Sequence, residues 1–411
     1  MRPDVAIIGG GAVGAACALE LVRRGAEVTL LERGPELGSG CSAGNAGLIC
    51  PSHSTPISNP AAVRNGFRWM LDSASPFYLK PRPAAVPWLV RFLLAARRAQ
   101  AGARAIRALS VASLELHAEL GHELDTGFER RGVLNAYATD ESYAAGRREA
   151  QSSGLAFEAL EGDKALALEP ALGPRTLGAV YYPQEAHVDP LRCVRALGAA
   201  AAAKGADIRT DVEVRRLRRE GDRVVIEASD GTLRPETVVL AAGAWSGALA
   251  RTVDVYLPLE GGKGYHVDLE SAEGDPRIPT WLQESWAIAT PLPGRLRLAG
   301  TLELAGLDLT INSRRADAVR DGGVRGLRGL EGRRVIDVWA GLRPCTPDGL
   351  PVIGRPKGLP GLLLATGHAM KGVSLAPVSA KLVGELVAGE TPNQDVAPFR
   401  PDRFRPLLPL R

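Results

Sequence analysis

The sequence predicts an α/β fold in which a Rossmann-like domain with a parallel sheet is joined to an α+β domain with an antiparallel sheet. Three observations lead to this prediction. Between positions 4 and 32, an apolar run, a glycine-rich turn, a helical pattern and a second apolar run follow one another. A further apolar run, at positions 237–240, leads into small residues. Alternating apolar and polar residues recur between positions 254 and 304, which is typical of antiparallel strands with one solvated face.

The opening stretch carries the most specific pattern. Residues 5–8 are continuously apolar, as in a strand buried on both faces of a parallel sheet. Gly9, Gly11 and Gly14 follow with the spacing Gly-x-Gly-x-x-Gly. The first glycine permits a tight turn, the second lets the backbone approach a pyrophosphate, and the third lets the next helix pack on the strand. The start of that helix offers free N–H groups to phosphates.

Glu32 ends the second apolar run, 18 residues after Gly14. A carboxylate at this place can accept hydrogen bonds from both ribose hydroxyls of an adenosine, and it would repel the 2′-phosphate of NADP. The strand, the turn, the helix and the acidic strand end together favour a dinucleotide site over a purely structural turn. They leave FAD and NAD as alternatives.

Length and composition exclude several classes of protein. A chain of 411 residues suggests two or three domains, or one domain with a large insertion. The net charge, 50 − 46 = +4, is too small and too dispersed to indicate nucleic-acid binding. The five cysteines include no Cys-x-x-Cys pair, so no metal site is expected, and a reducing compartment is favoured. No signal peptide or membrane-spanning run is recognised, so we expect a cytoplasmic protein.

Residues 38–47 form a segment unusually rich in small residues. A solvent-exposed loop usually carries more charge, so this density predicts a backbone that lies against a flat ligand. A flexible linker is the alternative.

The segment from Val63 to Leu109 is basic, with one acidic residue and nine basic ones, and it contains the apolar run 88–94. One hypothesis is an amphipathic surface that meets anionic lipid or a redox partner, which would make the protein peripheral to the inner membrane. The other, which the prolines favour, is an ordinary helical segment whose apolar face joins the core.

The remaining elements follow from periodicity and turn residues. Asp189 precedes Pro190 and an alanine-rich run to Lys204, which predicts an N-capped helix. The tail repeats the order strand, glycine-rich turn and helix between residues 362 and 377. We expect helices at 109–124 and 314–330, strands at 129–138, 178–182, 208–216, 223–228, 237–240, 265–269, 295–299, 335–339 and 362–365, and a loop at 341–349.

Five separated motifs together resemble the FAD-dependent amine and amino-acid oxidoreductases of the D-amino-acid oxidase fold. The first is the N-terminal glycine motif with Glu32 and the Asn45-Ala46-Gly47 loop. The others lie at 185–190, 241–246, 341–344 and 367–377. Residues 45–47, 67–94 and 346–349 look most like bacterial D-amino-acid dehydrogenases, including D-hydroxyproline types. Glycine and sarcosine oxidases share the rest.

The resemblance implies a glutathione-reductase-like FAD-binding domain with a non-covalent FAD. The glycine motif would hold the pyrophosphate, Glu32 the ribose, Val214 the adenine, and residues 42–47 the ribityl chain and isoalloxazine. Residues 367–372 would hold the pyrimidine end at a helix N-terminus, where the dipole favours the negative charge of reduced flavin. The expected FAD contacts are Gly9, Gly11, Ala12, Val13, Gly14, Glu32, Arg33, Ser42, Ala43, Asn45, Ala46, Gly47, Leu48, Val214, Ala242, Gly243, Trp245, Arg343, Gly367, His368, Met370, Lys371, Gly372 and Val373.

Arg343 is the expected substrate residue, because in the family the arginine of the Gly-Leu-Arg-Pro motif pairs with the substrate carboxylate. A guanidinium fork suits a carboxylate bidentately. A structural arginine that caps carbonyl groups is the alternative. Many relatives add a tyrosine from the strand before Arg295, but here that region reads Glu284-Ser285-Trp286-Ala287. Trp286, Tyr265 and His53 are therefore the other candidates for the pocket.

The expected reaction is oxidation of an amino acid, of D-amino acid, D-proline or D-hydroxyproline type, by hydride transfer to FAD. The single glycine motif disfavours a nicotinamide co-substrate. The electron acceptor is a quinone, oxygen or a partner protein. The alternatives are a glycine/sarcosine-type oxidase and the FAD subunit of a multisubunit dehydrogenase. The expected division places residues 1–60, 188–250 and 335–411 in the FAD-binding domain, and residues 61–187 and 251–334 in the substrate-binding domain.

Overall fold

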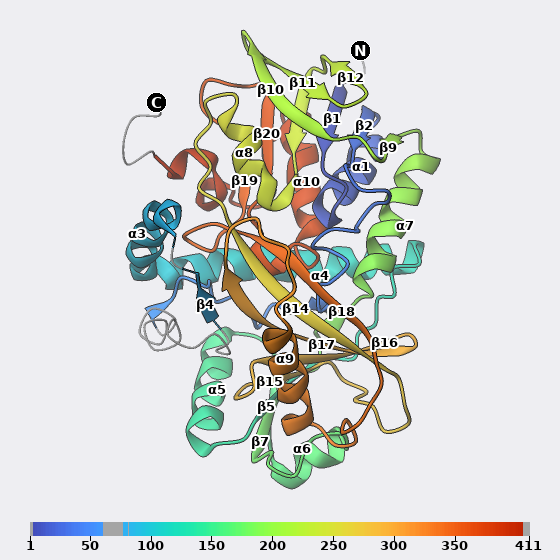
Figure 1. The fold of residues 1–411 in the computed structure, drawn as a ribbon, viewed down its shortest axis with the longest axis vertical. Coiled ribbons are helices and arrows are strands. Elements are labelled where there is room, and N and C mark those ends of the chain that lie inside the picture. Colours follow the sequence, from blue (N-terminus) through green and yellow to red (C-terminus); the bar gives the residue numbers. More distant parts are fainter. Residues whose placement is uncertain (1–2, 61–76, 81, 406–411) are drawn as a thin grey trace.

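The computed structural model describes residues 3–60, 77–80 and 82–405. Within these residues the strands form a six-stranded sheet, a nine-stranded sheet, a three-stranded sheet and a two-stranded pair. Figure 1 shows the smaller of the two large sheets in the upper half of the molecule and the larger one below it. The α/β class predicted from the sequence is confirmed.

The six-stranded sheet is the Rossmann-like part and has the order β19-β20-β13-β1-β2-β9. Its neighbours run parallel except for β19 and β20. The strands come from three distant parts of the chain, so the C-terminal segment completes a sheet that the N-terminus begins. The bounds are β1 Asp4–Ile8, β2 Glu27–Leu31, β9 Asp207–Arg209, β13 Thr237–Leu240, β19 Val352–Gly354 and β20 Leu362–Thr366.

Helix α1, Ala12–Arg23, packs closely on this sheet because its buried face carries small side chains. A Cβ atom on Gly14 would overlap the carbonyl oxygen of Gly9, so only glycine allows this approach. Two further helices pack against α1: α7, Pro190–Ala203, and α10, Ala376–Val387. The predicted cap of α7 is confirmed, since the Asp189 side chain accepts hydrogen bonds from the N–H groups of Leu191 and Arg192.

The three-stranded sheet corrects one prediction. A single strand over 208–216 is wrong, because Asp211 has a left-handed backbone with φ of 56° and turns the chain there. The residues before it form β9 in the parallel sheet, and those after it begin β10. The bounds are β10 Val214–Glu220, β11 Arg223–Ala228 and β12 Gly231–Leu233.

The nine-stranded sheet has the order β18-β14-β17-β16-β15-β5-β7-β6, with β4 beside β17. Helix α9, Ser313–Gly326, covers one face of this sheet. The β4–β17 and β15–β5 pairs are parallel and the others antiparallel. The bounds are β4 Phe77–Leu79, β5 Val133–Tyr137, β6 Glu158–Glu161, β7 Gly178–Tyr182, β14 Glu260–Glu270, β15 Thr280–Leu282, β16 Ala287–Leu292, β17 Arg295–Leu304 and β18 Val335–Cys345.

Strand β18 corrects a second prediction. The loop expected from residue 341 is wrong over its first half, because Gly341 to Cys345 continue the strand and pair with β14. The expected domain division assigns β18 to the FAD-binding domain, whereas its pairing lies in the nine-stranded sheet. β18 therefore runs from that sheet toward the parallel one. The two-stranded pair joins β3, Leu48–Ile49, to β8, Ala186–His187.

The remaining α-helices of the described residues cover the surface. Helix α3 lies in the predicted basic segment, of which residues 63–76 and 81 are outside the described residues. Among the described residues, no helix is both long and apolar enough to cross a membrane. The bounds are α3 Val86–Ala95, α4 Ala99–Glu123, α5 Asp140–Ser153, α6 Gly162–Leu168 and α8 Ser246–Arg251.

Candidate active site

A cavity of about 430 Å³ lies at the carboxyl ends of β1 and β13, where a parallel sheet with helices on both faces presents its ligand site. Residues within 8–45, 212–249 and 342–373 line it, including Leu342 and Pro344 of β18. Fifteen of the residues expected to contact FAD lie in its wall: Gly9, Gly11, Ala12, Val13, Glu32, Arg33, Ser42, Asn45, Val214, Ala242, Gly243, Trp245, His368, Gly372 and Val373.

The turn after β1 forms one side of the cavity. Gly9 has a φ of 105°, and a Cβ atom there would lie 2.6 Å from the carbonyl oxygen of Ala241. The turn therefore requires glycine and leaves the start of α1 facing the cavity. The Ala12 N–H donates to Ser42 Oγ at 3.0 Å, which ties the helix start to the small-residue loop.

Glu32 stands at the end of β2 with its carboxylate already oriented. Its two oxygens accept hydrogen bonds from the N–H groups of Gly10 and Gly34, at 2.6 and 2.8 Å. Each oxygen keeps a lone pair for a ribose hydroxyl. Next to it, the guanidinium of Arg33 lies 3.6 Å from the ring centroid of Trp245, a cation–π pair in the cavity wall.

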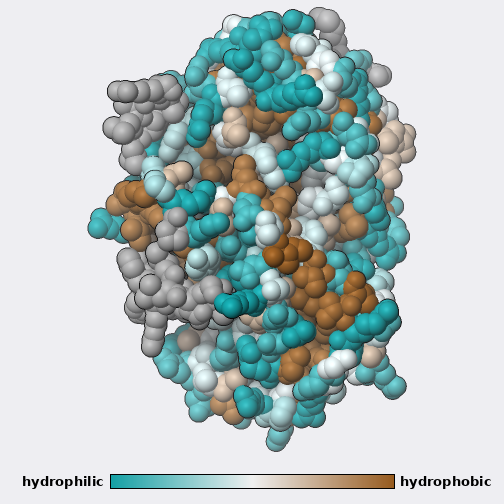
Figure 2. Space-filling view, in the orientation of Figure 1, coloured by the Kyte–Doolittle hydropathy of each residue, from teal (hydrophilic) through white to brown (hydrophobic). Residues whose placement is uncertain are grey.

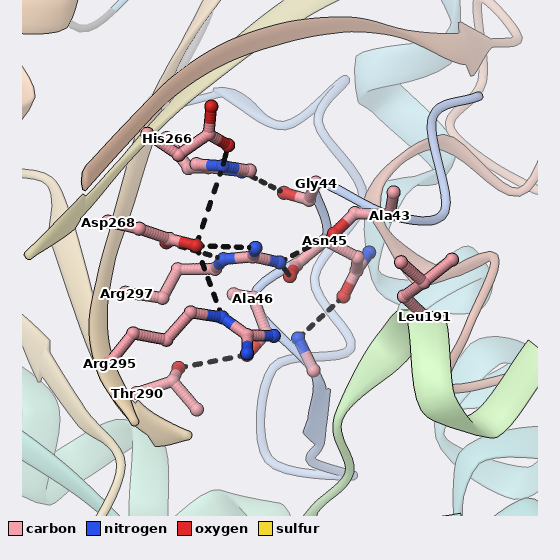
Figure 3. A network of polar contacts seen from close by, with 12 residues as sticks. Ala43, Gly44, Asn45, Ala46, Leu191, His266, Asp268, Thr290, Arg295 and Arg297 are labelled. Carbon is pink, nitrogen blue, oxygen red and sulfur yellow. Dashed lines mark hydrogen bonds and ion pairs between the residues drawn. The ribbon is translucent and has the colours of Figure 1, made fainter. Parts of the chain in front are cut away.

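Side chains of the nine-stranded sheet hold the loop of residues 43–46 (Figure 3). Arg297 donates to the carbonyl oxygens of Ala43 and Asn45 at 2.6 and 3.0 Å. Its other N–H groups form two hydrogen bonds of 2.9 Å with the carboxylate of Asp268. Thr290 Oγ1 donates to the carbonyl oxygen of Ala46 at 2.8 Å. The loop is thus fixed by one buried ion pair and its neighbours.

This contact corrects the expectation that the antiparallel sheet has one solvated face. Asp268 and Arg297 are 3% and 4% exposed, because that face of β14 and β17 meets the loop. The sequence pattern placed both residues in strands but did not indicate their contact with the loop. The available signal was the opposite charge at alternating positions of the two predicted strands, which pair in the structure.

The loop also reaches the turn after β20. Asn45 Nδ2 donates to the carbonyl oxygen of Met370 at 3.1 Å, and Asn45 Oδ1 accepts from the Gly47 N–H at 2.8 Å. In that turn His368 is buried and its Nε2 lies 2.8 Å from Ser379 Oγ. Burial lowers the pKa of His368 to about 4, so the ring is neutral. Gly367, Met370 and Lys371 lie in the turn but not in the cavity wall.

Arg343 lies on β18 between the cavity-lining residues Leu342 and Pro344. Its guanidinium covers Gly264 of β14, where a Cβ atom would overlap it. Its Nη1 donates to the carbonyl oxygen of Thr301 at 2.6 Å, and burial lowers the pKa of the side chain.

The structure does not bring the other three pocket candidates together around Arg343. Tyr265 is buried on the face of the sheet that packs on α9, and its hydroxyl donates to Glu303. Trp286 is 43% exposed, with a left-handed backbone. His53 stacks on Trp281 with ring centroids 4.3 Å apart, and burial lowers its pKa to about 3. Strand alternation places Tyr265 on the face of β14 that packs on α9, opposite the face that carries Arg343.

A family model described as FAD dependent oxidoreductase matches residues 4–386. The chain belongs to this family of FAD-dependent oxidoreductases. A D-amino acid dehydrogenase of Paramagnetospirillum magneticum is 34% identical, over 98% of this chain and 99% of that protein. A D-amino-acid oxidase of Bradyrhizobium diazoefficiens is 33% identical, over 97% and 98%. The crystal structure of glycine oxidase from Geobacillus kaustophilus superposes with a TM-score of 0.80 and 26% identity, over 98% and 100%.

FAD is the cofactor of this family, and the residues around the cavity fit it. Glycine is required at the turn where a pyrophosphate would approach, and the Glu32 carboxylate is aligned for a ribose. Ser42, Asn45, His368 and Gly372, which are expected to contact the flavin half of FAD, line the same cavity.

Arg297→Gln tests whether the buried pair supports the FAD loop. The variant leaves the Asp268 carboxylate buried with Arg295 as its main partner and frees two loop carbonyls. We expect the free energy of unfolding to fall by about 3 kcal/mol. We expect the dissociation constant of FAD to rise at least tenfold. Thermal denaturation and fluorimetric titration of released FAD measure these effects. Arg334→Gln is the matched control, because its ion pair with Glu270 is exposed; equal effects in both variants would contradict the role of Arg297.

Glu185 is a second buried carboxylate, close to the end of the loop. It is 3% exposed and accepts hydrogen bonds from Ser52 N and Ser52 Oγ at 2.6 and 2.9 Å. Burial raises the pKa of Glu185 from 4.5 to about 7, against the opposing effect of these hydrogen bonds. In the unfolded chain the group ionises at its ordinary pKa.

The raised pKa predicts a pH-dependent stability. The folded protein keeps Glu185 protonated up to about pH 7. The contribution of Glu185 to the free energy of unfolding is therefore fully present below pH 4.5 and declines between pH 4.5 and 7. The decline amounts to at most about 3 kcal/mol. Glu185→Gln cannot ionise, so its melting temperature relative to the native protein should rise from pH 5 to pH 8. An identical pH profile for both proteins would show that Glu185 titrates normally.

Proposed function

We propose that this protein oxidises an amino acid by transferring a hydride from the α-carbon to FAD. The observation that carries the proposal is the position of Arg343. Arg343 lies on β18 between two residues of the cavity wall, next to the cavity and not in its lining, and its guanidinium fills the space that Gly264 leaves without a side chain. A charged planar fork at this place suits a carboxylate.

The geometry gives Arg343 a defined way to hold that carboxylate. Nη1 is engaged by Thr301 O, and among the described residues no hydrogen bond engages Nε or Nη2. These two groups can donate side by side to both carboxylate oxygens. Bound FAD supplies the hydride acceptor. The protein's task is then alignment of the α-carbon, which contributes much of the rate in such reactions.

The protonation states agree with a reaction that needs no strong protein base. His53 and His368 are both neutral near pH 7 because burial lowers the pKa of each. Hydride transfer requires an unprotonated substrate amine, and neutral surroundings favour that form over an ammonium.

We propose a D-amino acid, D-proline or D-hydroxyproline as the substrate class. The dehydrogenase and the oxidase that are about one-third identical along nearly their whole lengths support D-amino acids. A glycine/sarcosine-type oxidase is the second candidate, because the superposed glycine oxidase shares the complete fold at 26% identity. An FAD subunit of a larger dehydrogenase is the third.

We propose that the electron acceptor is a quinone or a partner protein, and that it meets helix α3. A membrane quinone would place the protein at the cytoplasmic surface of the inner membrane. Trp88 and Phe92 join the core, while Val86, Val90, Leu93 and Leu94 are 41–57% exposed on the same helix. Figure 2 shows this apolar surface at the left edge of the view. Arg97 and Arg98 follow directly and add positive charge, which suits anionic lipid.

Anaerobic reduction of the flavin tests the proposed reaction. The panel consists of D- and L-amino acids, D-proline, the hydroxyprolines, glycine and sarcosine. We expect loss of flavin absorbance with one class, and an at least 100-fold lower kcat/KM for Arg343→Met, since two charge-assisted hydrogen bonds are worth about 3 kcal/mol. FAD content should remain unchanged. Failure of every amino acid to reduce the flavin, or full activity of the variant, would refute the proposal.

Leu94→Asp tests the acceptor surface. Leu94 is 57% exposed, so the substitution should not disturb folding. With the substrate found above, we expect at least fivefold slower reduction of decylubiquinone in anionic vesicles and unchanged reduction of ferricyanide in solution. Leu177→Asp, at a site 46% exposed just before β7 and away from α3 in Figure 1, is the control. Rapid peroxide formation in air, with no difference between the variants, would instead favour an oxidase.

A further inference from the structure

Strand β17 contains a β-bulge directly beside Arg343. Lys263 of β14 pairs with Glu303, but Tyr265 pairs with Gly300. Two residues of β17, Thr301 and Leu302, therefore lie opposite the single residue Gly264. Thr301 has a φ of 56°, a left-handed backbone that costs a β-branched residue energy. Bulges often re-aim a group next to an active site.

The group that this bulge re-aims is the carbonyl of Thr301. In a regular strand a carbonyl points along the sheet to the neighbouring strand. Here the Thr301 oxygen accepts from Arg343 Nη1 at 2.6 Å, across from Gly264. Arg343 is thus fixed by a main-chain acceptor that exists only because one extra residue is inserted.

The opposite face of the sheet anchors the same bulge with a buried charged cluster. Tyr265 Oη donates to Glu303 Oε2 at 2.6 Å. Arg315 of α9 lies 3.6 Å from the same carboxylate and donates to Leu302 O at 3.4 Å. Lys263 lies 3.7 Å from the other carboxylate oxygen. Exposures of 0–6% show that all four side chains are inside the protein.

Such a cluster is a costly way to stabilise a fold. Taking charges out of water costs several kcal/mol per ion, and apolar side chains of the same volume often give equal or greater stability. What a charged cluster adds is a fixed geometry. Its contacts converge on Leu302 and Glu303, the two residues that follow Thr301.

We infer that Tyr265, Glu303 and Arg315 are positioning residues for the substrate-binding arginine. They fix the bulge, the bulge presents the Thr301 carbonyl, and this carbonyl holds one arm of Arg343 so that Nε and Nη2 face the substrate carboxylate. The inference rests on the proposed function, because it takes a carboxylate as the ligand of Arg343. It gives Tyr265 a role that does not require contact with substrate.

Tyr265→Phe tests the inference in the FAD-loaded enzyme. It removes the hydrogen bond to Glu303 and keeps the aromatic ring. Anaerobic stopped-flow reduction gives the substrate Kd and the limiting rate separately. We expect a five- to tenfold higher Kd, a limiting rate within twofold of the native one, and unchanged FAD content. A second probe is the amine that has the structure of the substrate without its carboxylate. Tyr265→Phe should oxidise this amine at the native rate, because the amine does not use Arg343.

Two further variants separate positioning from general stability. Glu303→Gln should raise the Kd as Tyr265→Phe does. Tyr181→Phe removes another tyrosine hydrogen bond of the same sheet, to Arg131 O, and should change neither Kd nor rate.

A native Kd in Tyr265→Phe and Glu303→Gln, with the native enzyme active, would overturn the inference and leave the proposed function standing. Equal losses for the substrate and for the amine would also overturn it, because the effect would then not pass through the carboxylate. Absence of flavin reduction in the native enzyme would instead reject the proposed function itself.

Discussion

The buried pair of Arg297 and Asp268 connects the two large sheets of this protein. Arg297 stands on the nine-stranded sheet, while the carbonyl groups that it binds belong to the loop that follows β2 of the parallel sheet. A guanidinium can serve both partners at once because it has five N–H donors in one plane. Removing this side chain would leave Asp268 with Arg295 as its remaining arginine partner and would leave two loop carbonyl groups without their donor. The loop that lies along the cofactor therefore depends on a residue about 250 positions away.

A second constraint is steric and comes from glycine. Gly9, Gly14 and Gly264 each occupy a place where a Cβ atom would collide with another part of the protein. At the first two, the missing side chain lets the backbone form the phosphate turn and lets α1 approach the sheet. At the third, it makes room for the Arg343 guanidinium. The cofactor site and the substrate arginine thus both depend on the absence of a Cβ atom at a glycine.

Local sequence predicted the elements whose cause is local. The β1–α1–β2 unit follows from the apolar run, the glycine spacing and Glu32, and all three lie within 32 residues. The α7 cap follows from Asp189 and Pro190. Strands β7 and β13 occur at the predicted positions, because their apolar runs are bounded by turn residues. The predicted strand bounds were wrong where one backbone angle or a distant partner strand determines the path of the chain. This is the case at Asp211 and in the continuation of β18 past Gly341.

The sequence by itself determined the dinucleotide turn, the acidic strand end and the small-residue loop, since each depends on residue types close together in the chain. Tertiary structure alone decided the surroundings of Arg343. Side chains alternate between the two faces of a strand, so a bulge or a shift in register changes which residues meet. Tyr265 therefore lies behind the sheet, Thr301 presents its carbonyl, and the polar faces of β14 and β17 bind the loop instead of water.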